Sequence, residues 1–162
     1  MARKGGEEDG KRTIVRNRRA RHDYDVLETL EAGISLLGPE VKSLRAGTVD
    51  VADAYAAIRR GEAFLLHLHI RPYPQAGREN PDPMRERRLL LHRREIARLE
   101  GRLSEGGTTL VPLSLYWKDG RCKVELALAR GRRKADKREA IREREEEREV
   151  RRALRARRDR GA

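Results

Sequence analysis

The sequence predicts a mainly β protein in which about six antiparallel strands curl into a barrel, with about three short helices around it. Short segments of alternating apolar and polar residues are separated by residues typical of turns, which is the pattern of half-buried strands. Asp119-Gly120 lies between two such segments and is the strongest signal for a β-hairpin in the chain. Aromatic residues make up only 4% of the chain, so the core must be aliphatic. A barrel lets short strands share one interior without long exposed edges.

The chain carries 39 Lys and Arg residues against 27 Asp and Glu residues, which gives a net charge of +12 and an isoelectric point near 10.6. This field attracts polyanions, with nucleic acid as the first candidate and an anionic membrane surface as the second. Charged residues make up 41% of the chain, so we expect part of it to be unfolded. There is no apolar run long enough to cross a membrane and no signal-peptide centre, and we expect a cytoplasmic protein.

The N-terminal region divides into a leader and a basic arm. Residues 1 to 13 have glycines and mixed charge without periodicity, and we predict a disordered leader. Residues 14 to 22 hold closely spaced Arg, Asn and His side chains, which are donors suited to phosphates and base edges. A nucleic-acid contact is favoured here over a merely solvated arm. The segment from Tyr24 to Gly33 is predicted to be a strand.

A short helix is predicted from Gly38 to Arg45, because Pro39 suits the first turn of a helix and Gly47 ends it. Val41 and Leu44 are three residues apart and share an apolar face. A helix of two turns is marginal alone, so this face must dock on the strands.

Further strands are predicted at residues 48 to 51, 54 to 58 and 64 to 70, with a turn at 60 to 62. His67 and His69 would project to one face, but a polar strand face explains this pair better than a metal site does. We therefore expect no metal.

Most of the six prolines fall between residues 72 and 84, which predicts a loop. Leu89, Ile96, Leu99 and Leu103 then keep helical spacing up to Gly106-Gly107, so a helix is predicted there. Arginines between residues 85 and 98 would give this helix a basic outer side, which favours RNA as a partner over a solvated face.

The hairpin completes the folded part near residue 130, so we predict a barrel domain over residues 14 to 130. The tail from 131 to 162 has too few apolar residues to fold alone but is rich in helix formers. It is predicted to be disordered when free and helical on a polyanion such as the ribosome.

The sequence shows no catalytic motif and no phosphate-binding glycine loop, so a binding protein without cofactor is favoured over an enzyme. Cys122 is the only cysteine, which excludes an internal disulfide and a cysteine-rich zinc cluster. It lies in a predicted strand and is expected to be a small buried hydrophobic residue.

Several ordered motifs together resemble the SmpB family, the SsrA-binding proteins of bacteria. They span about residues 14 to 158 and include Asn17 to Tyr24, Glu31 to Ile34, Gly38 to Arg45, His69 to Tyr73, Arg88 to Ile96, Thr109 to Leu113 and Lys123 to Leu126. The resemblance implies an OB-fold-like barrel that binds the tRNA-like domain of transfer-messenger RNA. It also implies delivery of that RNA to stalled ribosomes for trans-translation, the rescue of ribosomes and tagging of incomplete peptides.

The resemblance further implies partners and site residues. The tail would occupy the empty mRNA channel and the decoding centre of the small subunit. Elongation factor Tu and alanyl-tRNA synthetase would be met only through the RNA, and a monomer without membrane contact is expected. The positions that match the family at or supporting the RNA surface are Asn17, Arg18, Arg19, Arg21, His22, Glu31, Glu40, Lys42, Arg45 and Leu91. The matching tail positions are Arg132, Arg133, Lys134, Asp136, Lys137 and Arg138.

One position departs from the family pattern. Ala135 stands where the family often has His or Tyr before the Asp-Lys-Arg motif, and alanine cannot stack on a base. Two alternative functions stay open. The first is a general ribosome-associated RNA-binding protein with an OB-fold, and the second, more remote one is a small RNA-processing enzyme.

Overall fold

The computed structural model describes residues 11 to 132 and 134 to 160, without the side chains of 134 to 141, 143, 159 and 160. Contacts divide the chain into two units, Met1–Gly131 and Arg132–Ala162. The strands are β1 Lys11–Arg16, β2 Tyr24–Ile34, β3 Val49–Asp50, β4 Tyr55–Arg59, β5 Glu62–Leu66, β6 His69–Ile70, β7 Arg87–Leu90, β8 Thr109–Lys118 and β9 Arg121–Gly131. The helices are α1 Arg18–Asp23, α2 Gly38–Arg45, the 3₁₀ helix η1 Pro74–Glu79, α3 Arg93–Ser104 and α4 Lys134–Arg160.

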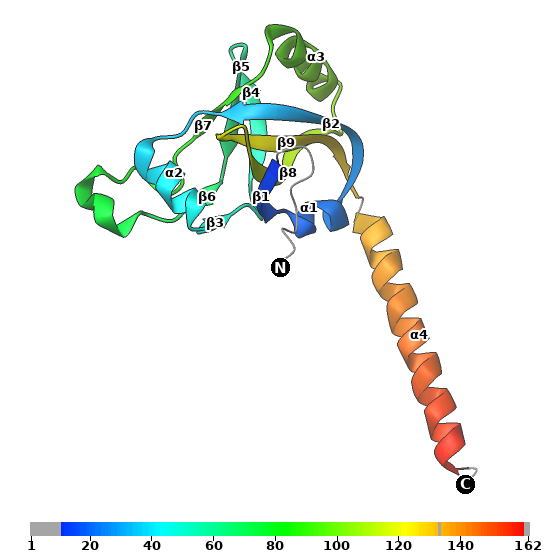
Figure 1. Cartoon of the computed structure of the whole chain (residues 1–162). Helices are drawn as coiled ribbons and strands as arrows, with labels where there is room; N and C mark the ends of the chain where they lie inside the picture. The colour runs from blue at the N-terminus through cyan, green and yellow to red at the C-terminus, as the bar shows by residue number, and fades with distance from the viewer. Residues whose placement is uncertain (1–10, 133, 161–162) are drawn as a thin grey trace. The chain divides into compact units, whose positions relative to one another are not determined.

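Six antiparallel strands form a closed ring in the order β8, β4, β5, β7, β2 and β9, with β9 paired back to β8 (Figure 1). β1 adds to the outside of this ring by pairing with β8, and β3 pairs with β6 in a separate two-stranded sheet. The ring confirms the predicted barrel. Its closure between β4 and β8 consists of one residue pair, Ala56 with Leu110.

The β8–β9 hairpin confirms the prediction made from Asp119-Gly120. Both turn residues have positive φ, 51° and 75°, which is the geometry that matches the twist of paired strands. The register shifts between Pro112 and Ser114 opposite β9. Proline cannot donate a ladder hydrogen bond, so a bulge beside it lets β8 remain in the sheet.

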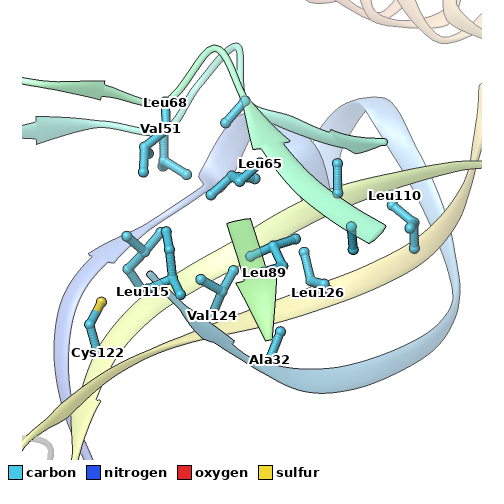
Figure 2. Packing of buried hydrophobic residues seen from close by; sticks show 14 of the residues in the cluster. Ala32, Val51, Leu65, Leu68, Leu89, Leu110, Leu115, Cys122, Val124 and Leu126 are labelled. Atoms are coloured by element: carbon cyan, nitrogen blue, oxygen red, sulfur yellow. The ribbon is translucent and has the colours of Figure 1, made fainter. Parts of the chain in front are cut away.

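The interior of the ring is aliphatic, as the composition predicts. Figure 2 shows Leu65, Leu89, Leu110, Leu115, Val124 and Leu126 in the core cluster. They come from β5, β7, β8 and β9, and each is at most 2% exposed. A smaller apolar cluster lies around Ala20 of α1, which packs with Val111, Leu113, Ala127 and Ala129 of the hairpin. Leu44 docks α2 on the main core, while Val41 is only partly buried.

Two predicted boundaries differ in the N-terminal half. β1 begins at Lys11, so strand structure starts within the segment predicted as a leader, because β8 offers a free edge for pairing with it. The predicted strand from 64 to 70 is broken at His67, whose φ of 58° ends β5 before β6 begins. Inward positions therefore change from Ala63 and Leu65 to Leu68 and Ile70.

The predicted helix after the proline-rich loop begins later than its leucine spacing suggested. Residues from Arg87 to Leu90 form β7 between β5 and β2, and α3 starts at Arg93. The boundary lies at His92, whose backbone N–H donates to Glu95 Oε1 at 3.0 Å in a capping box. The segment predicted as a loop contains the short 3₁₀ helix η1.

The tail residues of α4 are helical in the structure, and their disorder in the free protein stays a prediction. None of the helices within residues 11 to 132 and 134 to 160 is long and apolar enough to cross a membrane.

Candidate nucleic-acid interface

A polar groove of about 660 Å³ runs along the outer side of β1 and α1. Four cationic side chains line it, and Tyr116 and Glu125 face them from the hairpin. The full lining is Lys11, Thr13, Arg16, Asn17, Arg18, Arg21, Leu113, Ser114, Tyr116 and Glu125. Cations from two neighbouring elements thus share one concave surface, which suits the phosphates of a polyanion.

Asn17 positions α1 beside this groove. Its Oδ1 accepts the Ala20 N–H at 3.1 Å and caps the helix, while its Nδ2 donates to the carbonyl oxygens of Pro112 at 2.9 Å and Val51 at 3.3 Å. Asn17 is only 3% exposed. The amide of Asn17 is thus buried and bonded within the protein, and its predicted place at or supporting the RNA surface stays a prediction.

The four exposed basic residues of α1 have different neighbours. Arg18 and Arg21 line the groove, and among the described residues neither forms an ion pair. Arg19 instead lies 3.3 Å from Asp53 and 3.5 Å from Asp23. His22 Nδ1 lies 3.2 Å from the Asp23 carboxylate. Arg18 and Arg21 are thus the α1 cations best placed to bind phosphate in the groove.

Glu31 joins the groove through Tyr116, although the two residues are far apart in sequence. The Tyr116 hydroxyl donates a short hydrogen bond to Glu31 Oε2, and Lys118 Nζ lies 3.5 Å from the same oxygen. The hydrogen bond from Tyr116, supported by Lys118, lowers the pKa of Glu31 below its ordinary value despite partial burial. Lys11 Nζ lies 4.9 Å from the centre of the Tyr116 ring, so one ring links the acidic and basic sides.

Glu40 is in the protein interior, at 2% exposure. Its carboxylate accepts the Leu37 N–H at 2.9 Å, the Arg85 guanidinium at 2.5 Å and the Arg87 Nε at 2.7 Å. Burial alone would raise the pKa of Glu40, but these hydrogen bonds outweigh it and lower the pKa. In this structure the Glu40 side chain caps α2 and neutralises a buried arginine, and its predicted place at or supporting the RNA surface stays a prediction.

Lys42 and Arg45 are exposed on α2, and each lies over an aromatic ring. Lys42 Nζ is 5.4 Å from the centre of the Tyr73 ring, and the Arg45 guanidinium is 5.4 Å from the centre of the Trp117 ring. Arg45 also lines a recess of about 420 Å³ with Arg12 and Trp117. Thr13 lines both this recess and the basic groove, so the two surfaces adjoin.

The remaining predicted positions are described only in part. Leu91 is half-buried against the main core, directly before the N-cap of α3. Arg132 is exposed just after β9, Arg133 lies outside the described residues, and the helical positions Lys134, Asp136, Lys137 and Arg138 have no described side chains. Within the described part of the chain, no three His, Cys, Asp or Glu side chains lie close enough to hold a metal ion.

Sequence reasoning missed Lys11 and Tyr116 as members of this surface, whereas Arg16 lies in the basic arm predicted at residues 14 to 22. Lys11 falls in the predicted leader, and its strand has too few residues for periodicity to reveal. Tyr116 has no local signal at all, because its partner Glu31 is 85 residues away.

Comparisons with known proteins agree with the motifs. The profile of a family described as "SmpB protein" matches residues 14 to 156. The SsrA-binding protein of Frankia casuarinae is 56% identical over 147 residues, which cover 91% of this chain and 92% of that protein. The SsrA-binding protein of Thermobifida fusca is 54% identical over 160 residues, which cover 98% of this chain and 100% of that protein.

A solved structure is also similar. One chain of a structure described as "tmRNA-SmpB: a journey to the center of the bacterial ribosome" is 51% identical and superposes with a TM-score of 0.65. The match covers 79% of this chain and 94% of that chain.

Proposed function

This chain belongs to the SmpB family, and on that premise we propose that it binds the tRNA-like domain of transfer-messenger RNA and delivers this RNA to stalled ribosomes for trans-translation. The observation that carries the proposal is the basic groove of about 660 Å³, joined at Thr13 to the recess beside α2. A protein working with ribosomes acts in the cytoplasm. The groove holds cations suited to binding, and we assign it no bond-breaking step.

Within this proposal the RNA surface comprises the groove and the exposed side of α2. Arg18, Arg21, Lys42 and Arg45 would bind phosphates, and their contribution would weaken as salt rises. Arg19 and His22 would bind RNA at the edge of this surface once their contacts with Asp23 and Asp53 break. Glu31, fixed by Tyr116, is the non-cationic member of this surface and would accept hydrogen bonds from bases or ribose.

The tail would act on the ribosome rather than on the barrel's RNA surface. Helical residues from Lys134 to Arg160 would occupy the empty mRNA channel, with Arg132, Arg133, Lys134, Asp136, Lys137 and Arg138 nearest the decoding centre. Ala135 has no ring with which to stack on a base of the decoding centre. A neighbouring arginine or lysine would have to stack there instead.

Capture from total RNA tests the function directly. The immobilised full chain, incubated with total bacterial RNA at a fixed salt concentration, should enrich transfer-messenger RNA far above its abundance, as sequencing of the eluted RNA will show. A double variant, Arg18→Gln with Arg21→Gln, should lose most of this enrichment. Arg60→Gln with Arg78→Gln removes the same charge from exposed barrel positions outside the groove and serves as the control.

Recovery of mainly ribosomal RNA would contradict the proposal. That result would favour a general ribosome-associated RNA-binding protein instead. Equal enrichment by the groove double variant and by its control would remove Arg18 and Arg21 from the site.

A further inference from the structure

A second cavity of about 420 Å³ opens beside the indole of Trp117, and it shares no lining residue with the basic groove. Its apolar wall is formed by Leu36, Val41, Leu90 and Trp117. Arg121 and Lys123 of β9 also line it. Its volume is within the range of about 300 to 1,000 Å³ that is usual for ligand pockets. None of the predicted RNA-binding residues lines it.

The wall of this cavity leaves apolar surface in water. Leu90 is 55% exposed, although it belongs to a strand of the barrel. Gly33 is paired with Leu90, and a Cβ atom at Gly33 would come within 3.1 Å of the Leu90 Cβ. Glycine at this position therefore allows Leu90 to lie across β2 and form the wall. An exposed apolar surface beside cations is typical of a binding site.

The chemistry of the cavity matches a nucleotide. An aromatic ring and aliphatic side chains hold the face of a base, while arginine and lysine beside them neutralise its phosphate. Arg45 lies over the same Trp117 ring at 5.4 Å, which adds a third cation near the opening. An apolar protein segment would use the wall but would gain nothing from three cations.

The cavity is continuous with the proposed RNA surface. Trp117 lines both this cavity and the recess that contains Arg12 and Arg45, and Thr13 links that recess to the basic groove. Leu91, a predicted RNA-binding position, directly follows Leu90 in the chain. An RNA that covers the groove and α2 therefore passes the opening.

We propose that this cavity receives one unstacked nucleobase of the bound RNA, which stacks on Trp117 while its phosphate pairs with Arg121 or Lys123. Sequence-specific RNA recognition commonly uses unpaired bases that stack on aromatic side chains. The inference rests on the proposed function and adds to it a point at which the protein binds a base rather than phosphates.

Trp117 is the only tryptophan in the chain, so its fluorescence reports on the ring that borders this cavity and the adjoining recess. The full chain is titrated with the tRNA-like domain of transfer-messenger RNA, and binding is followed independently by the anisotropy of a label on the RNA. Stacking should quench Trp117 emission in parallel with binding and should shield the ring from acrylamide. Free N-acetyltryptophanamide with the same RNA corrects for light absorbed by the RNA.

A matched pair of variants tests the wall without disturbing Trp117. Leu90→Gln removes apolar surface from the cavity, whereas Leu27→Gln makes the same change at a strand position that is 43% exposed and lies outside it. Leu90→Gln should weaken RNA binding about threefold to tenfold and reduce the quenching, as expected for partial loss of base stacking. Leu27→Gln should bind like the parent chain.

Each other outcome overturns the inference. Binding seen by anisotropy with unchanged emission and unchanged acrylamide access would remove the base from the cavity and leave the proposed function intact. Absence of RNA binding would overturn both. Emission that changes with protein concentration in the absence of RNA would assign the cavity to a second copy of this chain.

Discussion

Glu31 and Glu40 are both carboxylates of the predicted RNA surface, yet they occupy opposite environments. Glu31 remains about one third exposed and is oriented by Tyr116, whereas Glu40 is 2% exposed between two arginines. Sequence could mark both positions, because both lie in the motifs that resemble the family. It could not separate a surface role from a buried one, since the arginine that buries Glu40 is 47 residues away.

Breaking the buried pair should destabilise the barrel. Glu40→Gln leaves the Arg87 cation uncompensated at 0% exposure, and we expect the free energy of unfolding to fall by about 3 kcal/mol or more. Glu62→Gln is the control, because its partner Arg88 lies 3.3 Å away at the surface and the expected change is below about 0.5 kcal/mol. Urea denaturation followed by circular dichroism measures both.

Because Glu40 titrates, the difference in stability between the parent chain and Glu40→Gln should depend on pH. The pKa of Glu40 in the folded protein lies below the ordinary 4.5, so its stabilisation is complete above that value and is lost as the pH falls through the folded pKa. The difference in free energy of unfolding between the parent chain and Glu40→Gln should therefore be constant near neutral pH and become smaller in acid. If Glu40→Gln and Glu62→Gln lower the free energy of unfolding equally at every pH, the stabilising role of the buried pair is contradicted.

Among the elements, those with local signals were predicted well. α2 begins at Gly38 and ends at Arg45 as expected, because a proline and a glycine mark its two ends. The β8–β9 hairpin follows from Asp119-Gly120 for the same reason. β7 was predicted as helix because the spacing of Leu89 and Ile96 fits a helical period, but pairing with β2 and β5 decides its conformation.

The hairpin turn can be tested with two glycine substitutions. Gly120→Ala places a side chain at φ of 75°, where an L-residue costs about 1 to 2 kcal/mol, so the protein should be less stable. Gly101→Ala makes the same change inside α3, where no positive φ is required and no atom would meet the new Cβ within 4 Å. It should gain about 0.5 to 1 kcal/mol. Thermal denaturation that shifts both variants in one direction would contradict this assignment of the turn.

For the whole molecule, sequence predicted the barrel and a separate tail. Alternating segments and an aliphatic composition were enough to propose a barrel of antiparallel strands. These patterns could not predict the strand order. Partners such as β1 and β8 are about a hundred residues apart, and neither segment carries a pattern that identifies the other. The assembly of the groove from β1, α1 and the hairpin depends on that order.

The division into two units predicts separable activities. A chain ended after Arg132 keeps the pairing of Gly131 with Tyr24 and should bind the tRNA-like domain like the full chain, by anisotropy at fixed salt. It should fail to tag peptides on stalled ribosomes in a reconstituted translation reaction, because the proposed tail is gone. Tagging equal to that of the full chain would contradict the role given to the tail.

Asn17 has a consequence for how variants of this barrel are interpreted. The ring has a seam between β4 and β8, where Ala56 and Leu110 are its single ladder pair. The side-chain amide of Asn17 donates hydrogen bonds to the carbonyl oxygens of Val51, shortly before β4, and of Pro112 on β8. It therefore connects the two strands where their own pairing is short. An Asn17 variant would therefore loosen the pairing of β4 with β8 and distort the groove, so loss of RNA binding in that variant would not by itself show that Asn17 contacts a base.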